Sequence, residues 1–451
     1  MPPVLALVLC SAFVVFLLRL ERKQSPTVSK TLWIPTIWFV YTSSKALGTW
    51  FKTGGDMETG SPTDRIFLVI LLVISLFVLS KRKFDWLKAV RENPWLAVII
   101  LYLLASVLWS GMPEISFRRW VRELIPVAMA FLVLSEKDPR LALESMIQRK
   151  IYILIPFSIV LIKYFPEYGR SYGRWSGGVE WVGVTYQKNS LALLCIFSIM
   201  YLVWKFVKEH HTKESAAPKM KIYADISVLL MSLYLLGGPS HTLKHSATST
   251  VALIVGLIIF AALLWSKRRG RLIGPFILKT LLIIIILYGT ITPFLGKLAI
   301  IDISSYFGRD ETLTGRADGI WAVLVPYAMK KPLLGHGFGG FWTTGMREMT
   351  SSHAHNGYLD TILNIGFIGL LLFSLYMLSC MSRAARVLIT DFFWGALFVC
   401  YVLMTIIHNI AESSIYDFTG TLTAAILLFY TTTGTAGFKI KNDSSPPGLN
   451  S

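Results

Sequence analysis

The sequence predicts an all-α, polytopic integral membrane protein, and three observations support this class. Hydrophobic residues make up 54% of the 451 residues and charged residues only 16%, which is too little charge to cover the surface of a soluble chain of this size. The mean hydropathy is +0.58. The apolar residues also fall in blocks of about 16–22 residues, the length that crosses a bilayer as a helix.

Taken in order, the apolar blocks predict about 12–13 transmembrane helices. We expect a single transmembrane domain over residues 1–436, with a large polar loop at 296–358 that carries short helices, and a polar tail at 437–451. The second block is the weakest because it contains Lys45. The predicted spans are 3–20, 31–51, 66–80, 95–110, 117–134, 151–165, 189–206, 222–237, 249–266, 274–295, 359–379, 393–409 and 419–436.

The distribution of positive charge predicts the orientation of these helices. The net charge is +18, but most lysines and arginines lie in alternate short loops, as is typical of cytoplasmic loops. The charge therefore gives no support to nucleic-acid binding. The remaining loops face outward and hold most of the glycine, tryptophan and histidine clusters, so we expect the functional site on that side. These loops are 52–65, 110–118, 166–188, 238–248, 296–358 and 410–418.

A histidine-containing segment, 352–360, is the first candidate site. It closes the longest polar segment and leads directly into the apolar run 361–378, where polar groups are unfavourable unless they meet other polar groups. A neutral imidazole at His355 can accept a proton near neutral pH. The alternative is an interfacial histidine that caps a helix or contacts a lipid headgroup. Gly366 and Gly369 follow, and this spacing favours close approach of another helix.

Arginines mark the second candidate site. Arg316 opens an amphipathic stretch that ends at Lys330-Lys331, and a glycine-rich segment, 335–340, lets the backbone approach a ligand. The segment is not a Walker loop, because no Gly-Lys-Ser/Thr sequence follows. The alternative is that these cations lie on lipid headgroups.

A third cluster, residues 168–189, combines Arg170, Arg174 and Lys188 with aromatic residues and glycines. One guanidinium group can bind two phosphate oxygens at once through two parallel N–H donors. The composition therefore suits an anionic ligand that carries sugars. An aromatic belt at the membrane surface is the alternative, although outward loops are usually poor in basic residues.

Two smaller groups complete the candidates. Arg118, Arg119 and Arg122 are spaced to share one face of a helix, and charges this close to the hydrocarbon usually pair or line a cavity. Local ion pairs with Glu114 and Glu123 are the simpler interpretation. Further along, Glu412 follows His408-Asn409 and can orient a histidine or bind a sugar hydroxyl.

Together these motifs resemble the O-antigen ligase and polymerase superfamily, over roughly residues 100–420. The branch it most resembles is the exopolysaccharide-production group. The His-Asn-x9-Gly-x-x-Gly spacing is the most specific of the shared features. The motifs are Gly315-Arg316 with Trp321, the turn Pro332–Gly337, His355-Asn356 with Gly366 and Gly369, and the phrases 113–123, 183–189 and 313–316.

The resemblance implies inverting glycosyl transfer that needs no metal and no cofactor. His355 is then the general base, with His353 as a possible substitute, and Arg316 neutralises the departing diphosphate with help from Arg170 or Arg174. Further substrate contacts are expected at Lys188, Asn189, His353, Asn356 and Arg122.

The implied donor is a glycan on undecaprenyl diphosphate, used at the periplasmic face of a bacterial inner membrane. A ligase would move this glycan onto lipid A core or another glycan acceptor, whereas a polymerase would join lipid-linked repeat units. A transporter is the alternative from a different class. It predicts ionisable residues at mid-span, and only Lys45 and Asp225 are clear candidates.

Overall fold

A computed structural model describes residues 1–54, 60–172, 178–212, 219–239, 246–296, 316–350, 352–415 and 417–434. Helices form nearly all of this part of the chain, and a short antiparallel sheet pairs β1 with β2. The predicted all-α, polytopic class is therefore confirmed. The elements are α1 (Pro3–Gln24), η1 (Lys30–Leu32), α2 (Trp33–Tyr41), α3 (Leu47–Trp50), α4 (Pro62–Lys81), α5 (Trp86–Glu92), α6 (Pro94–Ala105), η2 (Ser106–Trp109), α7 (Pro113–Leu134), α8 (Pro139–Tyr164), α9 (Pro166–Gly169), β1 (Arg170–Tyr172), β2 (Val179–Trp181), α10 (Lys188–Thr212), α11 (Lys219–Gly237), α12 (Ala247–Arg268), α13 (Pro275–Leu295), η4 (Arg316–Trp321), α15 (Ala322–Lys330), α16 (Thr344–Met349), α17 (Gly357–Thr390), α18 (Phe392–His408) and α19 (Thr421–Thr433).

Among the described residues, 8 helices are long and apolar enough to cross a membrane. A ninth span arises if α5 is joined to the segment Pro94–Trp109 across a 98° bend. The apolar helices α18 and α19 are shorter, at 17 and 13 residues. The 8 long helices are α1, α4, α8, α10, α11, α12, α13 and α17.

Several predicted spans differ from the observed helices, and two of these differences involve charged residues. The span at 31–51 is wrong as a continuous helix, because the chain forms η1, the nine-residue α2 and the four-residue α3. A break there is favourable, since it removes Lys45 from the middle of a span, and the ammonium group donates to the carbonyl oxygen of Tyr168. The span at 117–134 lies in α7, which starts earlier, at Pro113, and carries five charged residues in its first half.

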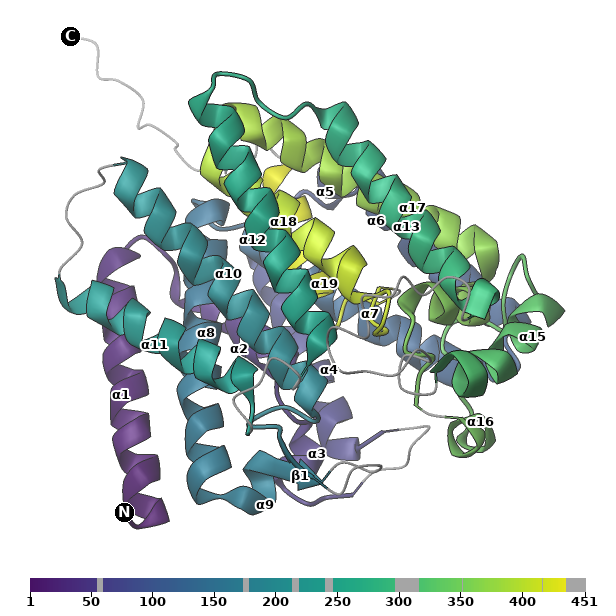
Figure 1. Ribbon diagram of the computed structural model, residues 1–451, viewed down its shortest axis with the longest axis horizontal. Coiled ribbons are helices and arrows are strands. Elements are labelled where there is room, and N and C mark those ends of the chain that lie inside the picture. Colours follow the sequence, from purple (N-terminus) through teal and green to yellow (C-terminus); the bar gives the residue numbers. More distant parts are fainter. Residues whose placement is uncertain are drawn as a thin grey trace, which may run out of the picture.

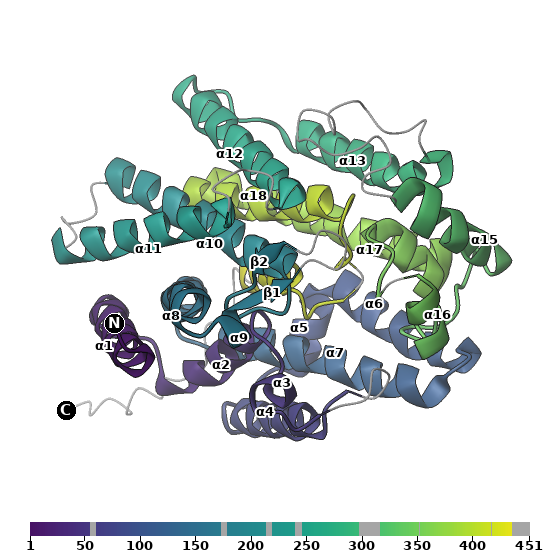
Figure 2. The same ribbon diagram turned by 60° about the horizontal axis from the view of Figure 1, so that its bottom comes forward.

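The described parts of the two sets of loops predicted from charge lie toward opposite ends of the bundle (Figure 1). One end holds α3, α9 and β1, with α16 near it, and the connection between α12 and α13 lies at the other end. Figure 2 turns the first end forward and shows α7 between α4 and α6. The glycine-, aromatic- and histidine-rich segments are therefore gathered on one side of the molecule.

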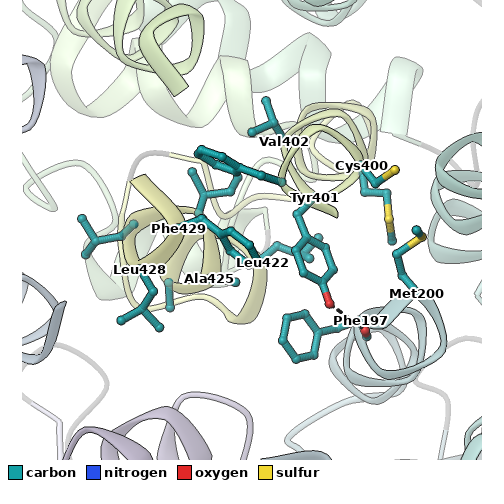
Figure 3. Packing of buried hydrophobic residues seen from close by; sticks show 14 of the residues in the cluster. Phe197, Met200, Cys400, Tyr401, Val402, Leu422, Ala425, Leu428 and Phe429 are labelled. Atoms are coloured by element: carbon teal, nitrogen blue, oxygen red, sulfur yellow. Dashed lines mark hydrogen bonds between the residues drawn. The ribbon is translucent and has the colours of Figure 1, made fainter. Parts of the chain in front are cut away.

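The centre of the bundle is a close-packed apolar core where α10, α18 and α19 meet (Figure 3). The ring of Tyr401 stacks on Phe197 with centroids 5.0 Å apart, and its hydroxyl donates to the Phe197 carbonyl oxygen at 3.1 Å. Phe429 of α19 lies on the other side, with its ring centroid 5.8 Å from that of Tyr401. The buried hydroxyl thus meets an acceptor, as a polar group inside a membrane protein must.

Two buried charge clusters elsewhere in the bundle are ion-paired. Asp225 forms an ion pair with Lys205 at 2.9 Å and accepts from the Tyr152 hydroxyl at 2.6 Å. Arg149 of α8 pairs with Glu21 of α1 at 2.8 Å. These contacts fasten α1 and α11 to α8 and α10, and they give Asp225 a structural partner rather than the exposed mid-span position that a transporter would require.

The long helix α17 is kinked at Gly366, which adopts φ 69° and ψ −176°. The turn that follows α15 packs into this kink: the backbone N–H of Phe367 donates to the carbonyl oxygen of Pro332 at 2.8 Å, and that of His336 donates to Leu363 at 2.9 Å. A side chain at Gly366 would collide with the backbone of Leu333. At Gly366, α17 is therefore approached closely by a loop, whereas the sequence led us to expect a helix there.

Replacing Gly366 by Ala should destabilise the fold by about 2 kcal/mol or more, because this backbone region is accessible essentially only to glycine. Thermal unfolding of the purified protein in detergent measures the change. Gly345→Ala is the matched control, since an added Cβ there meets nothing within 4 Å. Equal melting temperatures for the two variants would contradict the prediction.

Candidate functional site

A cavity of about 1020 Å³ opens between α4, α7 and α16 on the side that carries the outward loops. Its wall is rich in cations and includes apolar side chains from α4 and α7, such as Leu68, Val69 and Val121. Two carboxylates, Asp64 and Asp417, also line it. Such a surface suits an anionic ligand with an apolar part. The cations are Lys52, Arg65, Arg118, Arg119, Arg122 and Arg347.

The arginines of α7 line this cavity together, which confirms that they share one face of the helix. Arg118 pairs with Glu114, as predicted. Arg119 donates to the carbonyl oxygen of Gly339, so it also fixes the glycine-rich segment against α7. Burial raises the pKa of Asp417, and the positive charge of Arg122 opposes that rise, so the two groups lie close enough to interact.

The two predicted histidines lie together in the turn before α17. Their ring centroids are 4.0 Å apart, and the backbone N–H of His355 donates to Nδ1 of His353 at 3.2 Å. His355 has φ 53°, a left-handed conformation that is uncommon outside glycine and is often found at functional sites. We refer to residues 352–356 as the histidine turn.

Glu412, from the loop between α18 and α19, faces the histidine turn. Its Oε2 lies 3.9 Å from Nδ1 of His355, and its Oε1 accepts from the side-chain amide of Asn189 at 2.5 Å. The expectation that Glu412 can orient a histidine therefore has a geometric basis. Asn189, at the start of α10, joins the site by holding this carboxylate. One ligand atom from each of His353, His355 and Glu412 lies within 4.8 Å of the others, so these three residues could hold a metal ion.

Asp360 fixes the backbone of the histidine turn. Its carboxylate accepts from the backbone N–H of Ala354 at 3.0 Å and from the indole N–H of Trp342 at 2.9 Å. Ala354 is also held through its carbonyl oxygen, which accepts from the indole N–H of Trp321 at 2.9 Å. All four residues are buried, so the turn is held between two tryptophans of the long polar loop.

Asn356 begins α17 and ties it to two other segments. Its side-chain oxygen accepts from the backbone N–H of Leu359 at 2.8 Å, which caps the helix. Its amide donates to the carbonyl oxygens of Gly289 and Ile410 at 3.0 and 3.1 Å. The capping role that we considered for His355 thus belongs to its neighbour, while a substrate contact for Asn356 stays a prediction.

The cavity and the histidine turn are neighbours. Ser352, directly before His353, lines the cavity. Trp342 lines it too and binds Asp360, the residue that holds the turn. The side chain of His355 is 23% exposed, so solutes can reach it. The fold therefore brings the histidine turn to the edge of a cation-lined cavity.

The other predicted residues are distributed unevenly. Arg170 is exposed in β1 and donates to the carbonyl oxygen of Ile162 at 2.8 Å, outside the lining of the large cavity. Lys188 pairs with Glu180 at 2.5 Å. Arg174 and the side chain of Arg316 lie outside the described residues. The segment that Arg316 opens is nevertheless bound to the histidine turn, because Trp321 ends it.

Sequence reasoning assigned no role to Asp360, Trp342 or Arg347. An available signal pointed to Asp360: a carboxylate in the first turn of an apolar helix is costly unless it is bonded. Trp342 and Arg347 lie in the long polar loop, where nothing local distinguishes them from residues at the membrane surface.

Fold and site together define a multi-pass membrane protein with a polar, cation-rich site at one end of its helix bundle. A model of the O-Antigen ligase family matches residues 226–374, from α11 into α17. This match includes the predicted Arg316 and the histidine turn. The resemblance to the O-antigen ligase superfamily is therefore confirmed over these residues.

A relative supports the same conclusion. Exopolysaccharide production protein ExoQ of Rhizobium meliloti (strain 1021) is 22% identical over 311 residues, which cover 66% of this chain and 66% of the relative. The chain therefore spans about two thirds of the length of that relative.

Replacing Asn356 by Ala should destabilise the protein by about 2–4 kcal/mol, because the helix cap is lost and two buried carbonyl groups lose their donors. Thermal unfolding in detergent measures this effect. Thr343→Ala removes the cap of the short, more exposed helix α16 and should lower stability by less than about 1 kcal/mol. A larger loss in the Thr343 variant would refute the assigned role of Asn356.

Proposed function

We propose that the protein is a glycosyltransferase of the ligase type. Its donor is a glycan on undecaprenyl diphosphate, and its acceptor is a sugar hydroxyl of lipid A core or of another glycan. The reaction takes place at the periplasmic face of the bacterial inner membrane. The observation that supports this proposal best is the position of His355, next to Glu412 and in a turn whose first residue, Ser352, lines an arginine-rich cavity.

The donor diphosphate binds in the large cavity. Arg122 and its neighbours on α7 supply charge and paired N–H donors for phosphate oxygens, and the apolar wall formed by α4 and α7 receives the first part of the isoprenoid chain. A volume of about 1020 Å³ is ample for a diphosphate and the adjoining sugar. Arg316 adds charge at the departing diphosphate, consistent with the anchoring of its segment beside the histidine turn.

His355 acts as the general base. With its proton on Nδ1, facing Glu412, its Nε2 accepts the proton of the acceptor hydroxyl. The hydroxyl oxygen attacks the anomeric carbon, the bond from that carbon to the phosphate oxygen breaks, and the diphosphate leaves with the electron pair. The carboxylate of Glu412 stabilises the imidazolium that forms, and Asn189 holds this carboxylate in place.

This mechanism needs no metal, as the family resemblance implies, because guanidinium groups aimed at the developing charge can stabilise the transition state themselves. It also explains why the site lies at a membrane surface. The donor is already activated as a lipid diphosphate, so the protein supplies position, charge and a base.

A polymerase that joins lipid-linked repeat units is the second candidate. It shares every step above and differs only in its acceptor, which is another lipid-linked glycan. The relative whose printed name is an exopolysaccharide production protein favours this alternative. Purified protein offered a lipid-linked glycan alone will form longer lipid-linked products if it is a polymerase, whereas a ligase requires the second acceptor.

Replacing His355 by Ala should lower the rate of glycan transfer by roughly 100-fold or more, because a general base typically accelerates a reaction by at least that factor. The assay follows transfer of a lipid-linked glycan by the purified variant, with thermal unfolding to verify the fold. His210→Ala, at the exposed end of α10, should retain full activity. Wild-type transfer by a folded His355 variant would remove this residue from the mechanism.

Replacing Arg122 or Arg316 by Lys should lower transfer roughly 100-fold, because a point charge cannot replace paired N–H donors on the diphosphate. The same assay measures both variants. Arg140→Lys is the control, since this exposed arginine pairs with Asp391 away from the cavity. Near-normal turnover in the Arg122 variant would mean that the diphosphate binds elsewhere.

A further inference from the structure

The histidine turn has a property that base catalysis does not require. His353 and His355 come from one turn and Glu412 from the loop between α18 and α19, yet one ligand atom from each residue lies within 4.8 Å of the other two. Two imidazoles and one carboxylate are a common ligand set for Zn²⁺. We propose that these three residues form a zinc-binding site.

The distances fit this ion after a small adjustment. Zinc bonds of about 2.0–2.2 Å in a tetrahedral arrangement place the ligand atoms about 3.3–3.5 Å apart. Nδ1 of His355 lies 3.9 Å from Oε2 of Glu412, and all three ligand atoms lie within 4.8 Å of one another. The ligands therefore need to close by at most about 1.5 Å to reach tetrahedral spacing. Imidazole ligands select zinc and similar transition metals over magnesium or calcium, which prefer sites built from oxygen atoms.

The surroundings have the support that a metal site needs. The amide of Asn189 holds the far oxygen of Glu412 at 2.5 Å, which orients the other oxygen, and outer hydrogen bonds of this kind raise the affinity for metal. Asp360 fixes the backbone between the two histidines through Ala354. The side chain of His355 is 23% exposed, which gives the ion a route to the site from solvent.

Zinc at this site and base catalysis by His355 exclude each other, a consequence that rests on the proposed function. A metal on Nδ1 fixes the ring proton on Nε2, and Nε2 then cannot accept the proton of the acceptor hydroxyl. Zn²⁺ is therefore a reversible inhibitor of transfer, bound with three protein ligands and an open fourth position.

Calorimetric titration of the full-length, untagged protein in detergent with Zn²⁺ tests the site directly. We expect binding of one equivalent that is lost in His353→Ala and in Glu412→Gln. Asn189→Ala should weaken it roughly ten-fold, the usual effect of removing an outer hydrogen bond. Thermal unfolding without metal identifies any variant that fails to fold, and Glu412→Asp, which shortens the carboxylate arm, then replaces Glu412→Gln and should also lose affinity.

The control replaces a second pair of neighbouring histidines in the described part of the chain. His210 and His211 have ring centroids 5.6 Å apart at the end of α10. The variant in which both are replaced by Ala should still bind one equivalent of zinc. Zinc binding that survives Glu412→Gln but disappears in the control variant would overturn the proposal, as would no binding to the wild-type protein.

Transfer assays separate this proposal from the proposed function. Saturating Zn²⁺ should abolish transfer, and a chelator should restore it. If zinc binds with the expected pattern of variants but transfer continues unchanged, the metal site stands and the role of His355 as base is refuted. If zinc does not bind, the metal site is refuted while the His355→Ala test of the mechanism is unaffected.

Discussion

The buried carboxylate of Asp360 is the constraint on which the site depends. A carboxylate without partners in the first turn of a membrane helix would cost several kcal/mol, and here it accepts from the backbone of Ala354 and the indole of Trp342. These two bonds connect the start of α17, the histidine turn and the cavity wall. The position of His355 is therefore set by a group that takes no part in the chemistry proposed for it.

A second constraint is the membrane itself. Backbone groups inside a bilayer must be satisfied internally, so irregular structure lies at the ends of the bundle, and one end gathers α3, α9, β1 and α16. Polar side chains that a soluble enzyme would spread over a surface are concentrated there. The kink at Gly366 interrupts the regular backbone of α17, and the turn at Pro332–Gly337 packs against α17 at this kink.

The arginine-lined cavity and the histidine turn divide the proposed chemistry between charge and proton transfer. The cavity offers charge at fixed positions, and several of its arginines are themselves held, as Arg119 is by the carbonyl oxygen of Gly339. Positioned in this way, they need little rearrangement when negative charge develops on a leaving group. The histidine turn offers one imidazole, oriented by Glu412 and, through it, by Asn189.

The sequence by itself determined the all-α membrane class, the two sides of the bundle and the shared face of the α7 arginines, because hydrophobic length, charge and helical spacing are local properties of a chain. It also singled out His355 as the candidate base. It did not reveal that residues 31–51 break into short helices, since the polar partner of Lys45 comes from residue 168. Only the tertiary structure decided that Glu412 and Asn189 meet the histidine turn, that Asp360 holds it, and that a loop fills the kink at Gly366. Each of these contacts joins residues from different segments of the chain, and no periodicity in the sequence encodes which distant groups will satisfy one another's hydrogen bonds.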